Sequence, residues 1–417
     1  MSMQQMPSIN VQRLWNHIVE TGQYGATPRG GLTRLTLSAE DVQARNWLRQ
    51  RCEALGCTVN VDEMGNMFAL RQGLDNSRVP IAIGSHLDTQ PTGGRFDGIL
   101  GVLAGLEILQ TLHEQNIQTR SPLLLINWTN EEGSRFAPAM LCSGVYAGVF
   151  DKEEVYRIKD RQGISFQQAL EDSGYLGSEP VGKQRFAAHF ELHIEQGPLL
   201  ENHDIPIGVV QGSQAVRWHE VTLEGKRAHT GTTPMHLRRN ALLGAARLVE
   251  RIDAIALAHG PLGVGTVGLM EVKPNSRNVI PGTVFFCVDL RHPDDATVEK
   301  MDAQFRQALV EVCAEIGLEH ELKTVWHSPA VKFDAGCIAA VRAGAESAGL
   351  PAMDITSGAG HDAVYIARVA PSTMIFVKSV DGLSHNEAEY TSPEDCGHGA
   401  QVLMNAVLHY DRRPDGA

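Results

Sequence analysis

The sequence predicts an α/β protein of two domains: a larger one with a mostly parallel sheet and a smaller, ferredoxin-like one inserted into it. A chain of 417 residues is too long for one small core. Strand-like and helix-like runs alternate from about residue 38 to 130 and again after 330, which is typical of a parallel sheet with helices on both faces. Between 214 and 327 the order changes to β-α-β-β-α-β, the plan of a split βαβ unit. The expected segments are 1–212, 213–329 and 330–417.

In the larger domain, each element follows from the period of its apolar residues. The expected elements are a helix at 39–56, strands at 59–62, 67–71 and 81–84, a helix at 98–115, and strands at 123–128, 189–197 and 374–377. Ligands bind beyond the carboxyl ends of parallel strands, so the polar residues that follow these strands are the site candidates.

In the insert, long alternating runs predict half-buried strands, and two amphipathic runs predict helices. The expected strands are 214–225, 263–272, 283–291 and 320–326, and the expected helices are 240–259 and 294–317.

Composition excludes several classes of protein. The net charge is −13 and no basic block is present, which argues against nucleic acid or a membrane as partner. The N-terminus shows no secretory signal, and no apolar run is long enough to span a bilayer. Seven cysteines without a CxxC pair favour free thiols in a reducing cytosol, so we expect a cytoplasmic protein. The tail at 411–417 is expected to be disordered.

Metal-competent side chains gather in five short segments, each beside glycine. The segments are GSHLDTQPTGGRFDG (84–98), TNEEGSRF (129–136), HFELHIEQG (189–197), SGAGHDA (357–363) and GLSHNEAE (382–389). Together they supply enough nitrogen and oxygen ligands for two divalent metals and a general base. The pattern predicts a two-metal hydrolase.

The first segment presents His86 and Asp88 on one face of a strand end. His86 is either a metal ligand whose second nitrogen is fixed by a carboxylate such as that of Asp88, or a surface histidine beside a turn. Asp97 lies in GGRFDG before a helix, where it either caps a turn or bridges two metals.

The second segment holds the adjacent carboxylates Glu131 and Glu132. Adjacent carboxylates after a buried strand repel each other and are costly unless cations are near. One can bind a metal while the other reaches a water molecule, and a solvated acidic pair is the alternative.

In HFELHIEQG, four ionisable side chains share one face of the expected strand. His193 and Gln196 lie nearest its end and are site candidates, whereas a structural role is favoured for His189 and Glu191. His385 follows another apolar strand, again the position of a ligand.

The remaining candidates are open to a functional or a structural interpretation. His361 and Asp362 follow glycines that suggest backbone close to a substrate. His229 lies in a turn that either caps a helix or lets an imidazole polarise a substrate carbonyl. Asn278 precedes the strand that Arg291 ends, and a guanidinium there suits a carboxylate, although spacing alone favours a solvated arginine.

Taken together, the segments resemble the amidase branch of the metal-dependent aminoacylase/carboxypeptidase superfamily. That branch contains N-carbamoyl-L-amino-acid hydrolases, β-ureidopropionases and allantoate amidohydrolases. The resemblance runs from GGLTRL (30–35) to 382–389 and rests on HLDTQPTGGRFDGILGVLAGLE, NWTNEEGSRFAPAM, ELHIEQGPLLE, HTGTTPM, NVIPG, SGAGHDA and SHNEAE.

The resemblance implies a role for each matching residue. The implied ligands of one metal are His86, Asp97 and His193. The implied ligands of the other are Asp97, Glu132 and His385, with Asp97 bridging. Glu131 is the implied general base, His229 stabilises the oxyanion, and Asp88 orients His86. The residues implied to contact substrate are His229, Gln196, Asn278, Arg291 and the backbone of Gly360.

The resemblance also implies the activity: hydrolysis of the carbamoyl C–N bond of α-L or β N-carbamoyl amino acids to amino acid, carbon dioxide and ammonia. Zn²⁺ is the expected metal, with Mn²⁺, Co²⁺ and Ni²⁺ open, and the insert is expected to be the lid and dimerisation domain of a homodimer. The alternatives are allantoate hydrolysis, aminoacylase or dipeptidase activity and, last, a non-catalytic metal-dependent binding protein.

Overall fold

The computed structural model describes residues 7–413, so the predictions for the first six and last four residues fall outside it. The chain separates into two compact units, Met1–Gln211 with Lys332–Ala417, and Gly212–Val331. Each unit has its own hydrophobic core.

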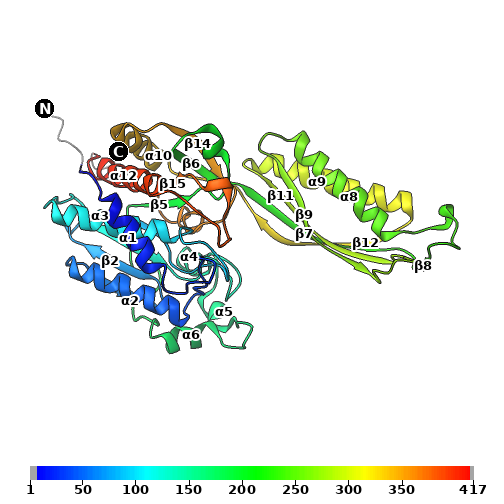
Figure 1. The fold of residues 1–417 in the computed structure, drawn as a ribbon, viewed down its shortest axis with the longest axis horizontal. Coiled ribbons are helices and arrows are strands. Elements are labelled where there is room, and N and C mark those ends of the chain that lie inside the picture. The colour runs from blue at the N-terminus through cyan, green and yellow to red at the C-terminus, as the bar shows by residue number, and fades with distance from the viewer. Residues whose placement is uncertain (1–6, 414–417) are drawn as a thin grey trace. The chain divides into compact units, whose positions relative to one another are not determined.

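The larger unit is built on one mixed sheet (Figure 1). Its strand order is β1 (Thr58–Val61), β2 (Met67–Arg71), β4 (Leu123–Trp128), β3 (Ile81–His86), β5 (Ala188–Ile194), β15 (Ser372–Val377), β6 (Ile207–Ser213) and β13 (Val331–Lys332), with β14 (Ala352–Ser357) paired to β6. The four central strands β4, β3, β5 and β15 are parallel, which confirms the predicted parallel sheet. Pairs nearer its edges, β1–β2, β2–β4 and β15–β6, are antiparallel.

Helices cover both faces of this sheet because successive strand residues point to opposite sides. Ile81, Ile83, Leu123 and Leu125 join one core, which also contains residues of α3 (Ile99–Glu114), α12 (Pro393–Asp411), α1 (Val11–Thr21), α2 (Ala39–Ala54) and α10 (Ala335–Ala348). Alternate residues, such as Leu124 and Ile126, join a second cluster with Ile366 of α11 (Asp362–Ile366) on the opposite face. The remaining helices are α4 (Leu141–Tyr146), α5 (Lys152–Arg157), α6 (Phe166–Ser173), α7 (Leu199–His203) and η2 (Val380–Gly382).

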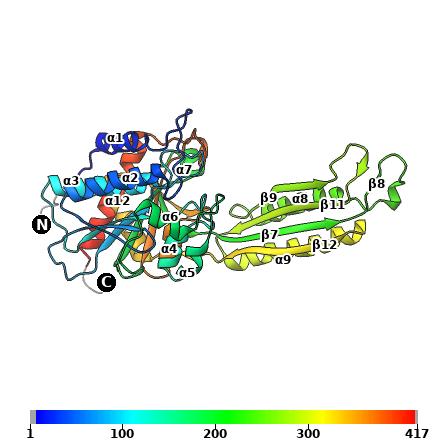
Figure 2. The ribbon, with the colours of Figure 1, turned by 90° about the horizontal axis from the view of Figure 1, so that it is seen from below.

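The smaller unit contains β7 (Ala215–Glu224), α8 (Ala241–Ala258), β9 (Val264–Lys273), β11 (Thr283–His292), α9 (Asp295–Ile316) and β12 (Glu319–Ser328) in that order. Its sheet runs β12-β7-β11-β9 with antiparallel pairs, and α8 and α9 pack on one face of it. A separate ribbon of β8 (Ala228–His229) and β10 (Val279–Ile280) lies at one end of the unit, close to η1 (Met235–Leu237) in the chain (Figure 2).

The predicted disorder of the tail is wrong for its first residues. Helix α12 continues to Asp411, whose carboxylate accepts hydrogen bonds from the backbone amides of Arg120 (2.6 Å) and Ser121 (2.8 Å). These two bonds hold the end of the helix against the loop before β4. Within residues 7–413, none of the helices combines the length and the apolar character that a bilayer span requires.

Candidate metal centre

Four segments that are distant in sequence meet beyond the carboxyl ends of the central parallel strands. His86 is the last residue of β3, and His193 is the penultimate residue of β5. Glu131 and Glu132 follow β4, and the loop that carries His385 follows β15. Since these strands run in the same direction, their ends deliver the side chains to one edge of the sheet.

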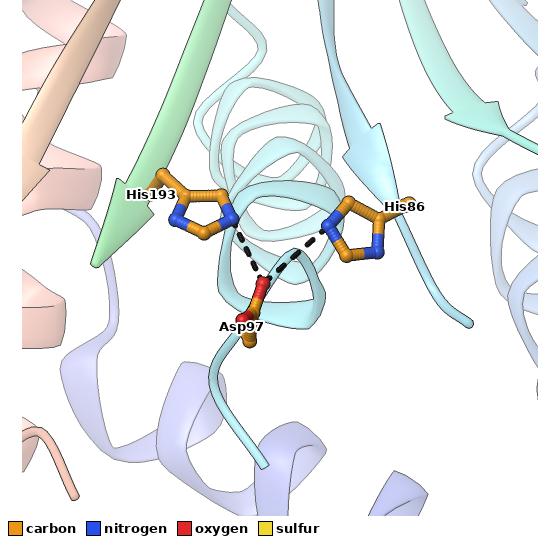
Figure 3. A group of neighbouring side chains, drawn as sticks. All are labelled: His86, Asp97 and His193. Carbon is orange, nitrogen blue, oxygen red and sulfur yellow. Dashed lines mark ion pairs between the residues drawn. The ribbon is translucent and has the colours of Figure 1, made fainter. Parts of the chain in front are cut away.

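Asp97 lies between two imidazoles in the first group of candidate ligands (Figure 3). Its Oδ1 is 3.5 Å from His86 Nε2 and 3.1 Å from His193 Nε2. All three side chains are almost fully buried. One ligand atom from each residue lies within 4.8 Å of the others, so a single cation can contact all three.

The other oxygen of Asp97 belongs to a second group. Asp97 Oδ2 is 3.4 Å from His385 Nε2, and Glu132 Oε2 is 3.5 Å from the same nitrogen. The His385 side chain is 52% exposed, so this group is the open side of the cluster. Asp97 thus offers one oxygen to each group, as a bridging ligand would.

Unusual backbone conformations position these side chains. Gly98 has φ +67° and forms a γ-turn in which the Ile99 amide donates to the Asp97 carbonyl at 2.7 Å. A Cβ at Gly98 would lie 2.3–2.4 Å from three atoms of the His86 ring, so only glycine fits there. Gln196 (φ 58°) and His385 (φ 53°) are left-handed without being glycine, a conformation that costs free energy and is concentrated at functional sites.

Hydrogen bonds to backbone carbonyls orient both buried imidazoles. His86 Nδ1 is 2.9 Å from the Asp88 carbonyl, and His193 Nδ1 is 2.9 Å from the Ile194 carbonyl. When Nδ1 carries the proton, Nε2 is left as the acceptor that faces Asp97, the tautomer that a metal ligand requires.

The expected role of the Asp88 carboxylate needs correction. It is 3.9 Å from His86 Nδ1, farther than the Asp88 carbonyl. It accepts instead from the amides of Glu131 and Glu132, both at 3.3 Å. The turn after His86 brings the carbonyl nearer to the ring, which leaves the carboxylate free to hold the start of the acidic loop.

The two adjacent glutamates have different neighbours. Glu131 Oε2 lies 3.6 Å from His86 Nε2, and burial, with further contributions from nearby carboxylates, raises the pKa of Glu131 well above its usual value. Burial also raises the pKa of Glu132, to about 7. Gln90 donates to both Glu132 oxygens, from its backbone amide (3.1 Å) and from Nε2 (2.7 Å).

Carboxylates crowd this edge of the sheet. Burial raises the pKa of Asp88 to about 6. For Asp97, burial also acts upward, but the neighbouring imidazoles of His193, His385 and His86 outweigh it and hold its pKa well below the usual range. So many buried carboxylates in one place are costly unless cations neutralise them.

Of the predicted substrate contacts, Gln196 touches a candidate ligand directly, and Gly360 packs against Met140. Gln196 Nε2 donates to Asp97 Oδ2 at 2.8 Å and to Ser384 Oγ at 3.1 Å, so the structure brings this residue to the candidate ligands themselves. A Cβ at Gly360 would be 2.8 Å from the Met140 side chain, so the backbone is closely packed there.

His361 and Asp362, left open by the sequence, lie beside the cluster. The His361 ring is 4.5 Å from the His193 ring, and its Nε2 is 3.0 Å from Ser357 Oγ. Asp362 Oδ1 is 2.5 Å from the Ser143 hydroxyl. Glu191, His193 and His361 form a third group of possible ligands, but it shares His193 with the first.

The structural interpretation of His189 and Glu191 is consistent with their contacts. Both are fully buried in β5. His189 Nε2 is 3.5 Å from Trp128 Nε1, and Glu191 accepts from Ser85 Oγ (2.7 Å) and the Ala363 amide (3.0 Å).

The smaller unit holds the other three predicted residues at two separate places. His229 in β8 pairs with Val279, next to Asn278, whose carbonyl accepts from the Thr230 amide at 3.2 Å. Arg291 pairs instead with Val216, near the start of β7, and Asp289 holds its guanidinium at 2.6–3.1 Å. The nine residues from Val216 to the end of β7 are eight steps along the strand and span about 26 Å at the rise of a β-strand. Within one chain His229 and Arg291 are therefore too far apart to contact the same small molecule.

Sequence reasoning missed three residues that contact the candidate ligands: Gln90, Ser384 and Glu389. Ser384 Oγ lies 3.0 Å from Asp97 Oδ2, and Glu389 accepts from the Asp97 amide at 3.1 Å. All three lie in the quoted segments 84–98 and 382–389, but only their contacts in the folded chain reveal their partners.

Comparison with known proteins gives consistent matches over nearly the whole chain. Residues 82–409 match the model of peptidase family M20/M25/M40. An N-carbamoyl-L-amino-acid amidohydrolase of Rhizobium meliloti is 48% identical over 400 residues, covering 96% of both chains. One of Geobacillus stearothermophilus is 37% identical over 407 residues, covering 96% of this chain and 98% of its own. The crystal structure of a hydantoinase/carbamoylase family amidase from Burkholderia multivorans superposes with a TM-score of 0.96 at 50% identity, covering 98% of this chain and 99% of the other.

Proposed function

The chain belongs to peptidase family M20/M25/M40, and from that premise we propose that it hydrolyses the carbamoyl C–N bond of N-carbamoyl amino acids. The products would be the amino acid, carbon dioxide and ammonia. That the protein is a hydrolase of amide C–N bonds follows from its family and its named relatives. One observation carries the finer proposal: Asp97 presents one oxygen to each of two ligand groups, with Glu131 beside them.

The residues present fit two divalent cations. His86 Nε2 is buried and has no hydrogen-bond partner among the described residues, although it faces carboxylates. Imidazole and carboxylate donors suit Zn²⁺, and Mn²⁺, Co²⁺ and Ni²⁺ accept the same set. The proposed ligands are His86, Asp97 and His193 for one ion and Asp97, Glu132 and His385 for the other.

Ions bound there would polarise the carbamoyl oxygen and lower the pKa of a water molecule. Glu131, a buried base beside His86, would accept the proton of that water as it attacks the carbamoyl carbon. It would then return the proton to the leaving nitrogen, so that the amino acid departs as an amine and the remaining carbamate decomposes to carbon dioxide and ammonia. His229 would donate to the developing oxyanion.

The substrate carboxylate is assigned to Arg291. Asp289 fixes its guanidinium, and such a planar fork suits bidentate binding of a carboxylate. Gln196, Asn278 and the backbone of Gly360 are proposed as further contacts. Segment 213–329 would be the lid and dimerisation domain.

We propose a homodimer because one chain cannot bring His229 and Arg291 to the same substrate. A second copy would supply the missing residue. The exposed apolar residues of α8 and the neighbouring edge strand β9 support this surface as the interface. They are Leu242, Leu243, Val249, Leu257, Val264 and Leu269.

The experiment that tests the activity is one substrate panel. It contains N-carbamoyl-L-α-amino acids, N-carbamoyl-β-alanine, allantoate and dipeptides, each assayed after reconstitution with Zn²⁺, Mn²⁺, Co²⁺ or Ni²⁺, with ammonia and free amino acid measured. Faster turnover of N-carbamoyl amino acids than of the others supports the proposal. Preferred turnover of allantoate or dipeptides would replace it, and tight binding without any product would indicate a non-catalytic binding protein.

All seven cysteines are free, which supports a cytoplasmic location as a further proposal.

A further inference from the structure

A buried carboxylate outside the candidate ligand set, that of Glu389, joins two of the loops that form the centre. It is 5% exposed. Its Oε1 accepts from the backbone amides of Phe96 (3.0 Å) and Asp97 (3.1 Å), and its Oε2 lies 2.9 Å from Ser384 Oγ. We infer that Glu389 is a positioning residue that sets the geometry between Asp97 and His385; the inference rests on the proposed metal centre.

The contacts of Ser384 complete this connection. Its hydroxyl lies between Glu389 Oε2 and Asp97 Oδ2, 3.0 Å from the latter. Glu389 therefore holds the Asp97 backbone amide directly, and its Oε2 and Asp97 Oδ2 both lie within hydrogen-bond distance of Ser384 Oγ, whose single proton can be donated to either carboxylate. Because Ser384 immediately precedes His385, the same contacts fix the loop that carries the half-exposed imidazole.

The sequence makes room for this carboxylate. A Cβ at Gly94 would lie 2.0 Å from Glu389 Oε1 and 2.5 Å from Glu389 Cβ. Gly94, the second glycine of GGRFDG, is thus required for Glu389 to reach the two amides. This contact joins residues almost 300 positions apart in the chain.

The two ligand groups depend on Glu389 to different degrees. In the first group the imidazoles come from strands β3 and β5, whose positions are fixed by the sheet. In the second group Asp97 and His385 both come from loops, and those are the two loops that Glu389 ties together. Loss of Glu389 should therefore weaken the second group more than the first.

Cohesion of the loops alone does not account for a buried carboxylate. The rings of Trp15, Phe96 and Tyr390 already pack together beside it, with centroids 5.9–6.3 Å apart. An apolar side chain at 389 would extend that cluster at lower desolvation cost. Only a hydrogen-bond acceptor at position 389 can orient the Asp97 amide and Ser384, and this is the function that we infer for Glu389.

The test is Co²⁺ binding to metal-free protein, followed by calorimetry and by the visible absorption of bound Co²⁺. Glu389→Ala should retain the first ion and lose about 10–100-fold in affinity for the second, as is usual when a partner of a metal ligand is removed. Glu389→Gln should stay within about threefold of wild type, because one amide oxygen still accepts both backbone amides and the NH₂ group reaches Ser384.

Asp411→Ala is the matched control. It also removes a buried carboxylate that accepts from two backbone amides, those of Arg120 and Ser121, but it lies away from the centre. It should lower thermal stability and leave both Co²⁺ affinities unchanged. Equal Co²⁺ binding by Glu389→Ala and wild type, or equal weakening by Asp411→Ala, would overturn the inference.

Gly94→Ala is a second variant, since its methyl group displaces the Glu389 carboxylate. It should reproduce the loss of the second ion. If neither variant folds, as judged by circular dichroism, while Glu389→Gln does, Glu389 is a folding residue and the inference is rejected. Failure of wild-type protein to bind two Co²⁺ ions would instead reject the proposed two-metal centre itself.

Discussion

Gly98→Ala should disable the centre although glycine 98 carries no functional group. The added Cβ would lie 2.3 Å from His86 Cε1 and Nε2, whereas non-bonded carbon contacts are about 3.5–4.0 Å. The His86 ring would have to move by roughly 1 Å to restore an ordinary contact, because the new Cβ is fixed to the backbone of residue 98. Metal–ligand distances tolerate only about 0.2 Å. A displacement of that size at a catalytic group costs on the order of 10²-fold, about 2.7 kcal/mol of transition-state stabilisation.

The assay compares kcat/KM for an N-carbamoyl amino acid and Co²⁺ affinity in Gly98→Ala and Gly148→Ala. Gly148 also has positive φ (+72°), but a Cβ there meets no described atom within 4 Å, so it controls for the backbone cost of alanine. We expect Gly148→Ala to keep near wild-type activity and Gly98→Ala to lose about 10²-fold with weaker binding of the first ion. If Gly98→Ala kept both activity and ion affinity, the placement of His86 beside Asp97 would be wrong.

Three further predictions test single residues. Glu131→Gln should lower kcat by about 10²–10⁴-fold while metal content, measured by mass spectrometry, stays at the wild-type level; near-native turnover would remove Glu131 from the mechanism. Arg291→Ala should lower kcat/KM for N-carbamoyl amino acids far more than for their methyl esters, and equal losses for acid and ester would refute carboxylate binding. Burial lowers the pKa of His189 to about 3, so the unfolded chain binds this proton more tightly and stability is lost as pH falls below about 6.5. Between pH 7 and pH 5 the free energy of unfolding of the metal-free protein, measured by denaturant titration, should fall by about 2 kcal/mol more than that of His189→Gln. Identical pH profiles for the two proteins would contradict a neutral core imidazole.

The core of the fold was predictable because each central strand is an apolar run between turn residues. Strands 67–71 and 123–128 were predicted with their observed bounds. The strand predicted at 81–84 continues to His86, because Ser85 and His86 pair with Asn127 and Trp128 of β4. The sequence did not indicate this extension because these two residues are polar. The antiparallel strands near the sheet edges were not foreseen, because alternation of elements does not specify where each strand inserts.

His86, Glu132, His193 and His385 could be named as candidates because they lie at or after strand ends, a rule of topology rather than of side-chain contact. Asp97 precedes a helix, and only the family resemblance decided between a turn cap and a metal ligand there. The contacts of Asp88, Gln90 and Glu389 were not predictable. Whether the carbonyl or the carboxylate of Asp88 faces His86 depends on the turn geometry. Glu389 reaches Asp97 only because the chain brings together loops that no local pattern relates.

The most direct test of the account is anomalous X-ray diffraction from crystals grown with Zn²⁺. The account predicts two zinc peaks per chain, each about 2.0–2.2 Å from a different oxygen of Asp97, one also contacted by His86 and His193 and the other by Glu132 and His385. A map with no peak at Asp97, or with zinc bound only elsewhere on the chain, would contradict it.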